Sequence, residues 1–189
     1  VLGVIAFLLV IFLNELTILM SVVGLFLAAT YPFMKRFTHL PQIYLGAAFG
    51  WAIPMAFAAQ TGSVPMIAWL LFVANVVWST IYDTFYAMAD REEDLLAGVK
   101  STAVLFGNDD KVIIAVLQVT FLVTMAMVGS QLELSFIYYI GVLVTLVLFV
   151  YQQHLVRDRE PTQCLQAFLN NNWVGAVLFA GIVGHYAFI

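Results

Sequence analysis

The sequence predicts an all-α fold, a polytopic transmembrane helical bundle, and three observations lead to that class. Apolar residues make up 63% of the 189 residues, whereas Lys, Arg, Asp and Glu make up 10%. A soluble domain carries about 25% charged residues, so this chain lacks the polar surface that water requires. Its apolar runs approach the ~20 residues with which a helix crosses hydrocarbon, while barrel strands are shorter and alternate in polarity. The lipid bilayer is therefore the expected solvent.

Polar residues and prolines divide the apolar sequence into seven expected spans, the first of them shortened. They cover residues 1–13, 16–34, 42–59, 65–89, 111–129, 134–153 and 165–189. Pro32 and Pro41 bracket the loop after the second span, and Pro65 suits a first helical turn. Residues 108–110, Asn-Asp-Asp, offer N-caps for the fifth span. The punctuation of the sequence thus agrees with the division into spans.

The third span carries two packing signals. Gly46 and Gly50 form a G-x-x-x-G pair, which lets a neighbouring helix approach closely. Pro54 lies in the same span and is expected to kink it.

The basic residues predict the orientation of the spans. The loops after the first, third and fifth spans contain no Lys or Arg, so all seven bases follow even-numbered spans. The positive-inside rule places these even loops in the cytoplasm. The first residue, Val1, lies within an apolar run without a basic leader, so we expect a single transmembrane domain over residues 1–189 that is truncated at its N-terminus.

Composition also excludes several functions. The net charge of −4 and the lack of a basic patch argue against nucleic acid as a partner. The single cysteine, Cys164, rules out a disulfide framework or a cysteine-based metal site. The histidines lack a ligand-like spacing and are assigned to no metal; they are His39, His154 and His185.

The informative residues are acidic and lie where the fourth span reaches the cytoplasm. Asp83, Asp90 and Asp94 are seven and four residues apart, which puts them within about 40° of arc if the helix continues. Asp90 and Asp94 are one turn apart and could serve one cation, while Asp83 lies about 10 Å deeper along the helix. Carboxylates crowded on one face need a positive partner, and a carboxylate inside an apolar span needs a functional reason.

Mg²⁺ is the expected partner of these carboxylates. It prefers oxygen ligands and is usually held by one or two carboxylates together with water and substrate phosphates. A solvated acidic loop is the alternative that the spacing alone leaves open. Three bases lie nearby and could either bind a phosphate or contact only lipid headgroups. They are Lys35, Arg91 and Lys100. Headgroup contact is the interpretation for the remaining arginines near this face, Arg36, Arg157 and Arg159.

Three consecutive asparagines lie near the cytoplasmic end of the last span. Residues 170–172 sweep about 200° of a helix, so at least one must face the bundle. A hydrogen bond between helices is favoured here over a substrate contact.

At these residues the sequence resembles the UbiA superfamily of membrane prenyltransferases, and within it the bacterial branch that prenylates 4-hydroxybenzoate. The resemblance rests on five segments that span most of the chain. They are Tyr-Pro-Phe-Met-Lys-Arg at 31–36, Leu-Gly-Ala-Ala-Phe-Gly-Trp at 45–51, the aspartate segment at 82–94, Lys-Ser-Thr at 100–102, and the three asparagines. It implies a nine-helix bundle with two aspartate-rich motifs, of which only the second is present here. The chain would then correspond to helices three to nine, and we expect it to be inactive alone.

The resemblance also implies roles for individual residues. Asp90 and Asp94 would bind Mg²⁺ on a polyprenyl diphosphate, with Asp83 supporting the site. Tyr31 and Lys35 match a Tyr-x-x-x-Lys element near the diphosphate. Further substrate contacts are expected from Tyr86, Arg91 and Lys100.

The implied reaction joins the polyprenyl group to the ring carbon ortho to the hydroxyl of 4-hydroxybenzoate, a step in ubiquinone synthesis. The expected location is the bacterial cytoplasmic (inner) membrane, with the active site towards the cytoplasm.

Other functions fit the sequence less well. Another UbiA-type aromatic prenyltransferase stays open. A CDP-alcohol phosphotransferase would need an Asp-Gly-x-x-Ala-Arg sequence, which is absent. A cation transporter or other membrane binding protein should carry ionisable residues near the middle of several spans, and these spans are almost free of charge there. A retinal receptor would need a lysine in its last span, where residues 170–189 contain none.

Overall fold

The computed structural model describes residues 2–188, and all regular secondary structure within that range is helical. The α-helices are α1 (Leu2–Val10), α2 (Glu15–Thr30), α3 (Met34–Phe37), α4 (Pro41–Gly50), α5 (Ala52–Thr61), α6 (Met66–Ala89), α7 (Arg91–Ala97), α8 (Thr102–Phe106), α9 (Asp110–Gln131), α10 (Phe136–Leu155) and α11 (Pro161–Phe188). Short 3₁₀ helices continue three of them and are η1 (Tyr31–Phe33), η2 (Gly107–Asp109) and η3 (Val156–Asp158). The predicted fold class is confirmed.

Six helical segments in the described residues are long and apolar enough to cross a membrane. They are Glu15–Phe37, Pro41–Thr61, Met66–Ala89, Thr102–Gln131, Phe136–Asp158 and Pro161–Phe188, which match the second to seventh expected spans. The expected first span, residues 1–13, differs. Its helix α1 has nine residues and rises only about 13 Å, less than half of the ~30 Å hydrocarbon layer. Residues 1 and 189, included in the first and last expected spans, lie outside the described range.

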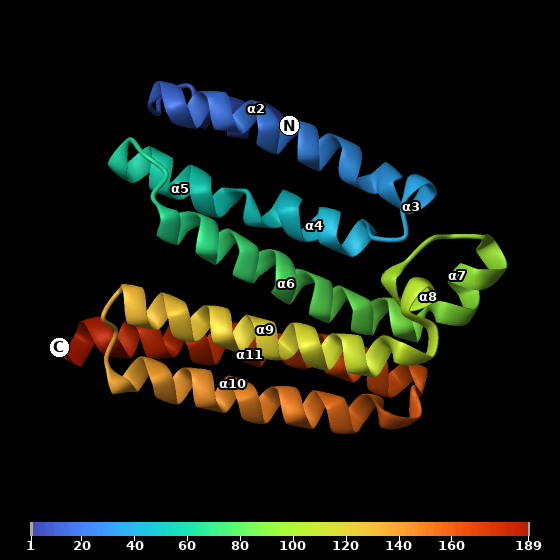
Figure 1. The fold of residues 1–189 in the computed structure, drawn as a ribbon. Helices are drawn as coiled ribbons and strands as arrows, with labels where there is room; N and C mark the ends of the chain where they lie inside the picture. Colours follow the sequence, from blue (N-terminus) through green and yellow to red (C-terminus); the bar gives the residue numbers. More distant parts are fainter. Residues whose placement is uncertain (1, 189) are drawn as a thin grey trace.

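Helix α6 lies at the centre of the bundle (Figure 1). It packs against α4 and α5 on one side and against α9 and α11 on the other, while α10 completes the second group. Helix α2 covers α4 and α5 from outside. The aspartate segment at the end of α6 is therefore positioned by both halves of the bundle.

The two packing signals in the third span behave as predicted. A Cβ atom added to Gly46 would lie 2.9 Å from the Cα atom of Val76, so α4 and α6 are in near-backbone contact. The predicted kink is an interruption at Trp51 between α4 and α5. Pro54 explains it, because proline has no N–H to donate to the carbonyl of Gly50.

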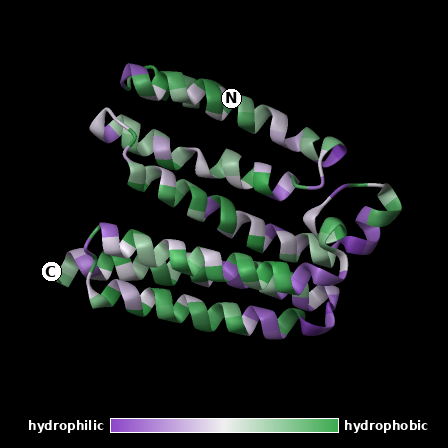
Figure 2. Cartoon of the chain, in the orientation of Figure 1, coloured by the Kyte–Doolittle hydropathy of each residue, from purple (hydrophilic) through white to green (hydrophobic). Residues whose placement is uncertain are grey.

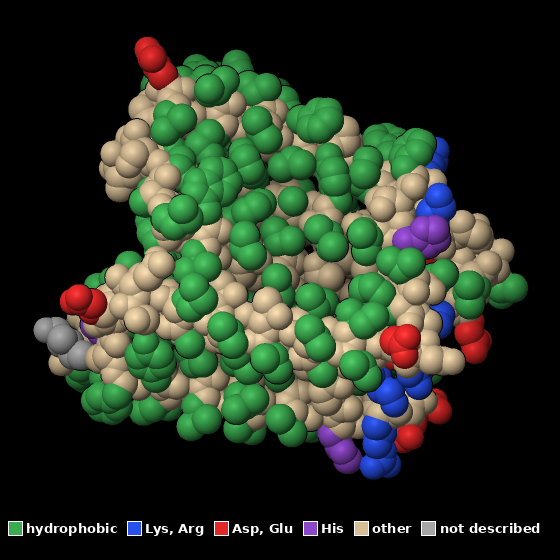
Figure 3. All heavy atoms as spheres, viewed as in Figure 1, with side chains coloured by type: hydrophobic (Ala, Val, Ile, Leu, Met, Phe, Trp, Pro, Cys, Tyr) green, Lys and Arg blue, Asp and Glu red, His purple; other side chains and the backbone are tan. Residues whose placement is uncertain are grey.

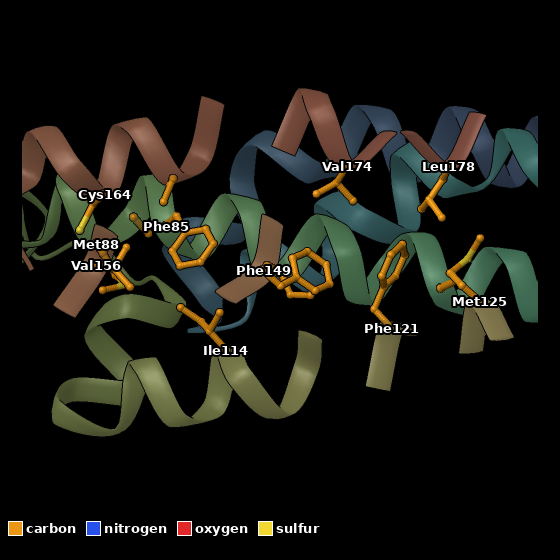
Figure 4. Packing of buried hydrophobic residues seen from close by; sticks show 14 of the residues in the cluster. Phe85, Met88, Ile114, Phe121, Met125, Phe149, Val156, Cys164, Val174 and Leu178 are labelled. Atoms are coloured by element: carbon orange, nitrogen blue, oxygen red, sulfur yellow. The ribbon is translucent and has the colours of Figure 1, made fainter. Parts of the chain in front are cut away.

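The main buried core joins α6, α9, α10 and α11 (Figure 4). Phe85, Phe121 and Phe149 belong to it, and the rings of the last two lie 5.8 Å apart. Large apolar side chains also cover the outside of the molecule, as lipid contact requires. Polar residues concentrate at one end of the bundle (Figure 2), where the Lys and Arg side chains gather in the view of Figure 3.

Candidate active site

The aspartate segment spans the junction of α6 and α7. Asp83 lies within α6, almost two turns before its end, and Asp94 lies in α7. The shared face expected for the three aspartates required the helix to continue through Asp94, and it does not: α6 ends at Ala89, and Asp90 (φ −94°, ψ 8°) separates α6 from α7. The N–H of Asp94 still donates to the carbonyl of Asp90 at 2.9 Å, so these residues remain one turn apart. The helix break removes the basis for placing Asp83 on the same face as the other two.

All three aspartates nevertheless lie near one side chain, Tyr86. Its hydroxyl lies within electrostatic reach of the carboxylates of Asp83, Asp90 and Asp94. Tyr86 is 40% exposed, and its ring packs edge-on against Phe168 with centroids 5.3 Å apart. The hydroxyl is therefore open to a ligand while the ring is fixed by α11.

Tyr31 and Lys35 reach the same region from the end of the second expected span. The Lys35 ammonium and the Tyr31 hydroxyl both lie within electrostatic reach of Asp83. The structure thus brings three of the residues that the sequence singled out near Asp83, namely Tyr31 of η1, Lys35 of α3 and Tyr86 of α6. It does so at the end of the bundle where the bases gather (Figure 3).

The carboxylates have capacity for a cation. The Oδ2 atom of Asp94 is buried and has no hydrogen-bond partner, which is costly unless something positive approaches it. Within residues 2–188 no group of three or more acidic, His or Cys side chains is close enough to hold an ion alone. A pair such as Asp90 and Asp94 instead fits Mg²⁺ that arrives with phosphate oxygens and water.

Lys100 lies beside the segment that carries Lys35. Its backbone N–H donates to the carbonyl of Lys35 at 3.3 Å, and its ammonium donates to the carbonyl of Phe37 at 3.3 Å. Lys100 therefore joins the loop between α7 and α8 to α3, which carries Lys35, the other lysine predicted to contact a phosphate.

Arg91 lies differently from the sequence expectation. Its guanidinium pairs with Asp110, on the first turn of α9, instead of facing the Asp83 to Asp94 carboxylates. Arg159 pairs with the same carboxylate, so the expectation that it serves only lipid headgroups is wrong. For Asp110 the sequence predicts only a helix cap, because it cannot show that two arginines from distant loops reach this carboxylate.

A pocket of about 310 Å³ lies between α4, α6 and α11, and Tyr82 of its lining directly precedes Asp83. Its lining combines aromatic and amide side chains and consists of Phe49, Asn75, Trp78, Tyr82, Phe168, Leu169, Asn171 and Asn172. Phe168 contacts both Tyr82 and Tyr86, so the pocket adjoins the carboxylate site. The arrangement provides a pocket of aromatic and amide side chains near a group of carboxylates.

The asparagines at residues 170–172 act mainly between helices, as predicted. The side-chain oxygen of Asn171 accepts from the indole N–H of Trp78 at 3.1 Å, and that of Asn170 accepts from Gln152 at 3.0 Å. Asn172 is exposed and lines the pocket.

Comparison with known proteins agrees with this architecture. Residues 1–181 match the UbiA prenyltransferase family. The chain belongs to this family. Among solved structures, the apo structure of a UbiA homolog from Aeropyrum pernix K1 superposes with a TM-score of 0.80 at 23% identity, over 94% of this chain and 66% of that one. A digeranylgeranylglyceryl phosphate synthase structure gives 0.74 at 19% identity, over 96% and 66%. Both show that the bundle has the UbiA fold.

Curated UbiA-family relatives are considerably closer in sequence. A 4-hydroxybenzoate octaprenyltransferase of Nitrosococcus oceani is 60% identical over 182 residues, which are 96% of this chain and 64% of the relative. The protein of the same name from Photobacterium profundum is 59% identical over 178 residues, or 94% and 62%. The chain thus spans less than two thirds of the length of these relatives.

Proposed function

We propose that the full-length protein transfers a polyprenyl group from a polyprenyl diphosphate to the ring of 4-hydroxybenzoate, in ubiquinone biosynthesis and with Mg²⁺. The observation that carries the proposal is the convergence of Tyr31, Lys35, Asp83, Tyr86, Asp90 and Asp94 beside an aromatic pocket. The choice of acceptor is supported by relatives at 54 to 60% identity that bear the name 4-hydroxybenzoate octaprenyltransferase.

The residues at the site suit the departure of diphosphate. Asp90 and Asp94 would hold Mg²⁺, and the bound ion would supply positive charge to the leaving diphosphate. The Lys35 ammonium and the hydroxyls of Tyr31 and Tyr86 can donate to the same oxygens. Donors aimed at a developing negative charge lower the barrier because they bind it more strongly as it grows.

The pocket suits the organic half of the reaction. The allylic carbon–oxygen bond breaks with its electron pair on oxygen, and a ring carbon of the acceptor supplies the pair for the new carbon–carbon bond. That ring carbon then loses its proton, which the released diphosphate can accept. Phe168 and Tyr82 border the path, where aromatic faces attract a cation and apolar walls exclude water.

In this proposal the protein spans the bacterial inner membrane, and its site lies on the cytoplasmic side. The support is the positive-inside rule, since the bases occupy the same end of the bundle as the aspartates. The two substrates then enter from different phases, the polyprenyl diphosphate through its tail in the lipid and the benzoate from water.

The test measures incorporation of radiolabelled 4-hydroxybenzoate into extractable lipid by membranes that contain the full-length protein. Label should appear only with an added polyprenyl diphosphate and should disappear with EDTA and return with Mg²⁺. Lipid labelling from a different aromatic acceptor, with none from 4-hydroxybenzoate, would replace this acceptor by that of another UbiA-type enzyme. Activity that survives complete removal of divalent cations would contradict the metal assignment.

A further inference from the structure

Asp110 is a completely buried carboxylate at the cytoplasmic start of α9. Its side chain is 0% exposed. Arg159 donates to it through Nε at 3.0 Å and through Nη2 at 2.9 Å, and Arg91 donates through Nη2. The backbone N–H of Lys111 adds a fourth donor at 2.6 Å. A charge removed from water to this extent requires such partners, and several charge-assisted hydrogen bonds satisfy it.

The helix that carries Arg91 has little else to fix its orientation. Helix α7 contains no buried residue, and Leu96 is 90% exposed. Apolar packing therefore cannot set the rotation of α7 about its own axis. At its far end, Gly98 adopts the left-handed conformation (φ 66°), and Lys100 then hydrogen-bonds to Lys35. The anchor at the near end is the pair between Arg91 and Asp110.

Arg159 connects Asp110 to a third segment, the turn between α10 and α11. It lies in the turn between η3 and α11 and has a left-handed backbone (φ 57°), a conformation that is unfavourable for a residue with a Cβ atom. Its guanidinium also donates to the carbonyl of Asn108 at 2.8 Å. Paired donation to Asp110 thus holds Arg159 in place and joins the α10–α11 turn to the α8–α9 junction.

We infer that Asp110 is a positioning residue, which through Arg91 and Arg159 fixes helix α7 so that Asp90 and Asp94 face a metal-bound diphosphate. Arg91 lies directly after Asp90 and three residues before Asp94, so α7 cannot turn without moving both carboxylates. The pair also keeps the Arg91 charge on Asp110, where it does not compete with a cation for Asp90 or Asp94. The identity of the ligand in this inference rests on the proposed function, whereas the contacts of Asp110 with Arg91 and Arg159 are observed within this chain.

The first experiment measures amide hydrogen exchange in the metal-free, full-length protein. Asp110→Asn keeps the shape of the side chain and removes its charge. Exchange over residues 91–99 should become severalfold faster, because α7 loses its near anchor, while exchange in the middle of α6 and α9 should stay unchanged. The matched control is Asp158→Asn, which removes the carboxylate of an exposed pair with Arg157 and should leave exchange over 91–99 unchanged.

The second experiment follows binding of Mn²⁺, as a probe for Mg²⁺, by electron paramagnetic resonance in the presence of inorganic diphosphate. Misplaced carboxylates in Asp110→Asn should weaken Mn²⁺ binding by about tenfold, the lower end of the loss seen when a residue that orients metal ligands is replaced. In the prenyl-transfer assay the half-saturating Mg²⁺ concentration should rise by the same factor, with most of kcat regained at saturation. If Asp110 only stabilised the fold, the apparent kcat would instead fall in proportion to the fraction of folded protein, and the metal affinity would be unchanged.

A second variant guards against failure of Asp110→Asn to fold. Arg91→Lys keeps the positive charge opposite Asp110 but loses the planar fork, and it should show the same two changes to a smaller extent. Unchanged exchange and unchanged Mn²⁺ affinity in either folded variant overturn the inference. If the unmutated protein binds Mn²⁺ and diphosphate but transfers no prenyl group to 4-hydroxybenzoate, the proposed function fails while the positioning result stands.

Discussion

Replacing Asp94 by asparagine should separate stability from activity. The Oδ2 atom of Asp94 is buried without a partner, and the side chain makes none of the hydrogen bonds found within residues 2–188. Asp94→Asn removes the carboxylate charge and keeps the volume of the side chain. The amide still places a polar atom at the unpartnered position, so the main change in stability is the loss of a negative charge from the first turn of α7, which costs about 0.3–1 kcal/mol. The variant should therefore unfold at nearly the same temperature as the parent.

Activity should instead fall strongly. Loss of one carboxylate ligand weakens the charge placed on the leaving diphosphate, and removal of a single electrostatic contact of this kind costs about 10²–10³ in kcat. The assay is incorporation of radiolabelled 4-hydroxybenzoate by membranes matched for protein content, with thermal unfolding of the purified variant in detergent as the stability measurement.

The matched control for Asp94→Asn is Glu92→Gln. It removes an exposed charge from the same turn of α7, next to the proposed metal ligands but directed to solvent. It should change neither activity nor unfolding appreciably. Near-parental activity in Asp94→Asn, or an equal loss in Glu92→Gln, would refute the assignment of Asp94 to the metal. A large fall in unfolding temperature would show that Asp94 has a structural partner.

Three further predictions test the fold and the site. Gly46→Leu should lower the unfolding temperature, since overpacking costs about 1–3 kcal/mol and an added Cβ already lies 2.9 Å from the backbone of α6, whereas Gly3→Ala, with open space around it, should not. The orientation can be tested in a variant without the native cysteine. A cysteine that replaces Ser63 should react with an impermeant thiol reagent applied outside the cell, whereas a cysteine that replaces Asp158 should not. Labelling of both positions from outside would contradict the predicted orientation. Residues 1–189 expressed alone should insert into membranes but should show little prenyl-transfer activity. One pair of carboxylates would leave most of the six Mg²⁺ coordination positions to water. Activity equal to that of the full-length protein would show that this pair suffices.

The amino-acid sequence is enough to predict that this protein lies in a membrane, that it is helical, and at which end of the bundle the candidate site lies. These properties depend on composition, on the length of apolar runs and on the distribution of charge, all of which act locally along the chain. Asp83, Asp90 and Asp94 stood out because carboxylates at the end of an apolar span are costly without a purpose. Gly46 could likewise be assigned to helix packing from its spacing to Gly50 alone.

The pairing of side chains could be learned only from the folded bundle. The helix breaks at Asp90, although the residues around it are good helix formers, and a short separate helix follows. Arg91 and Arg159 are 68 positions apart in the sequence yet share Asp110, so neither role could be assigned before the three loops were placed together. The physical reason is that burial and partner choice depend on distances between segments, which the sequence of any one segment does not contain. Periodicity determines which face a helix buries, and only the packed bundle determines what that face meets.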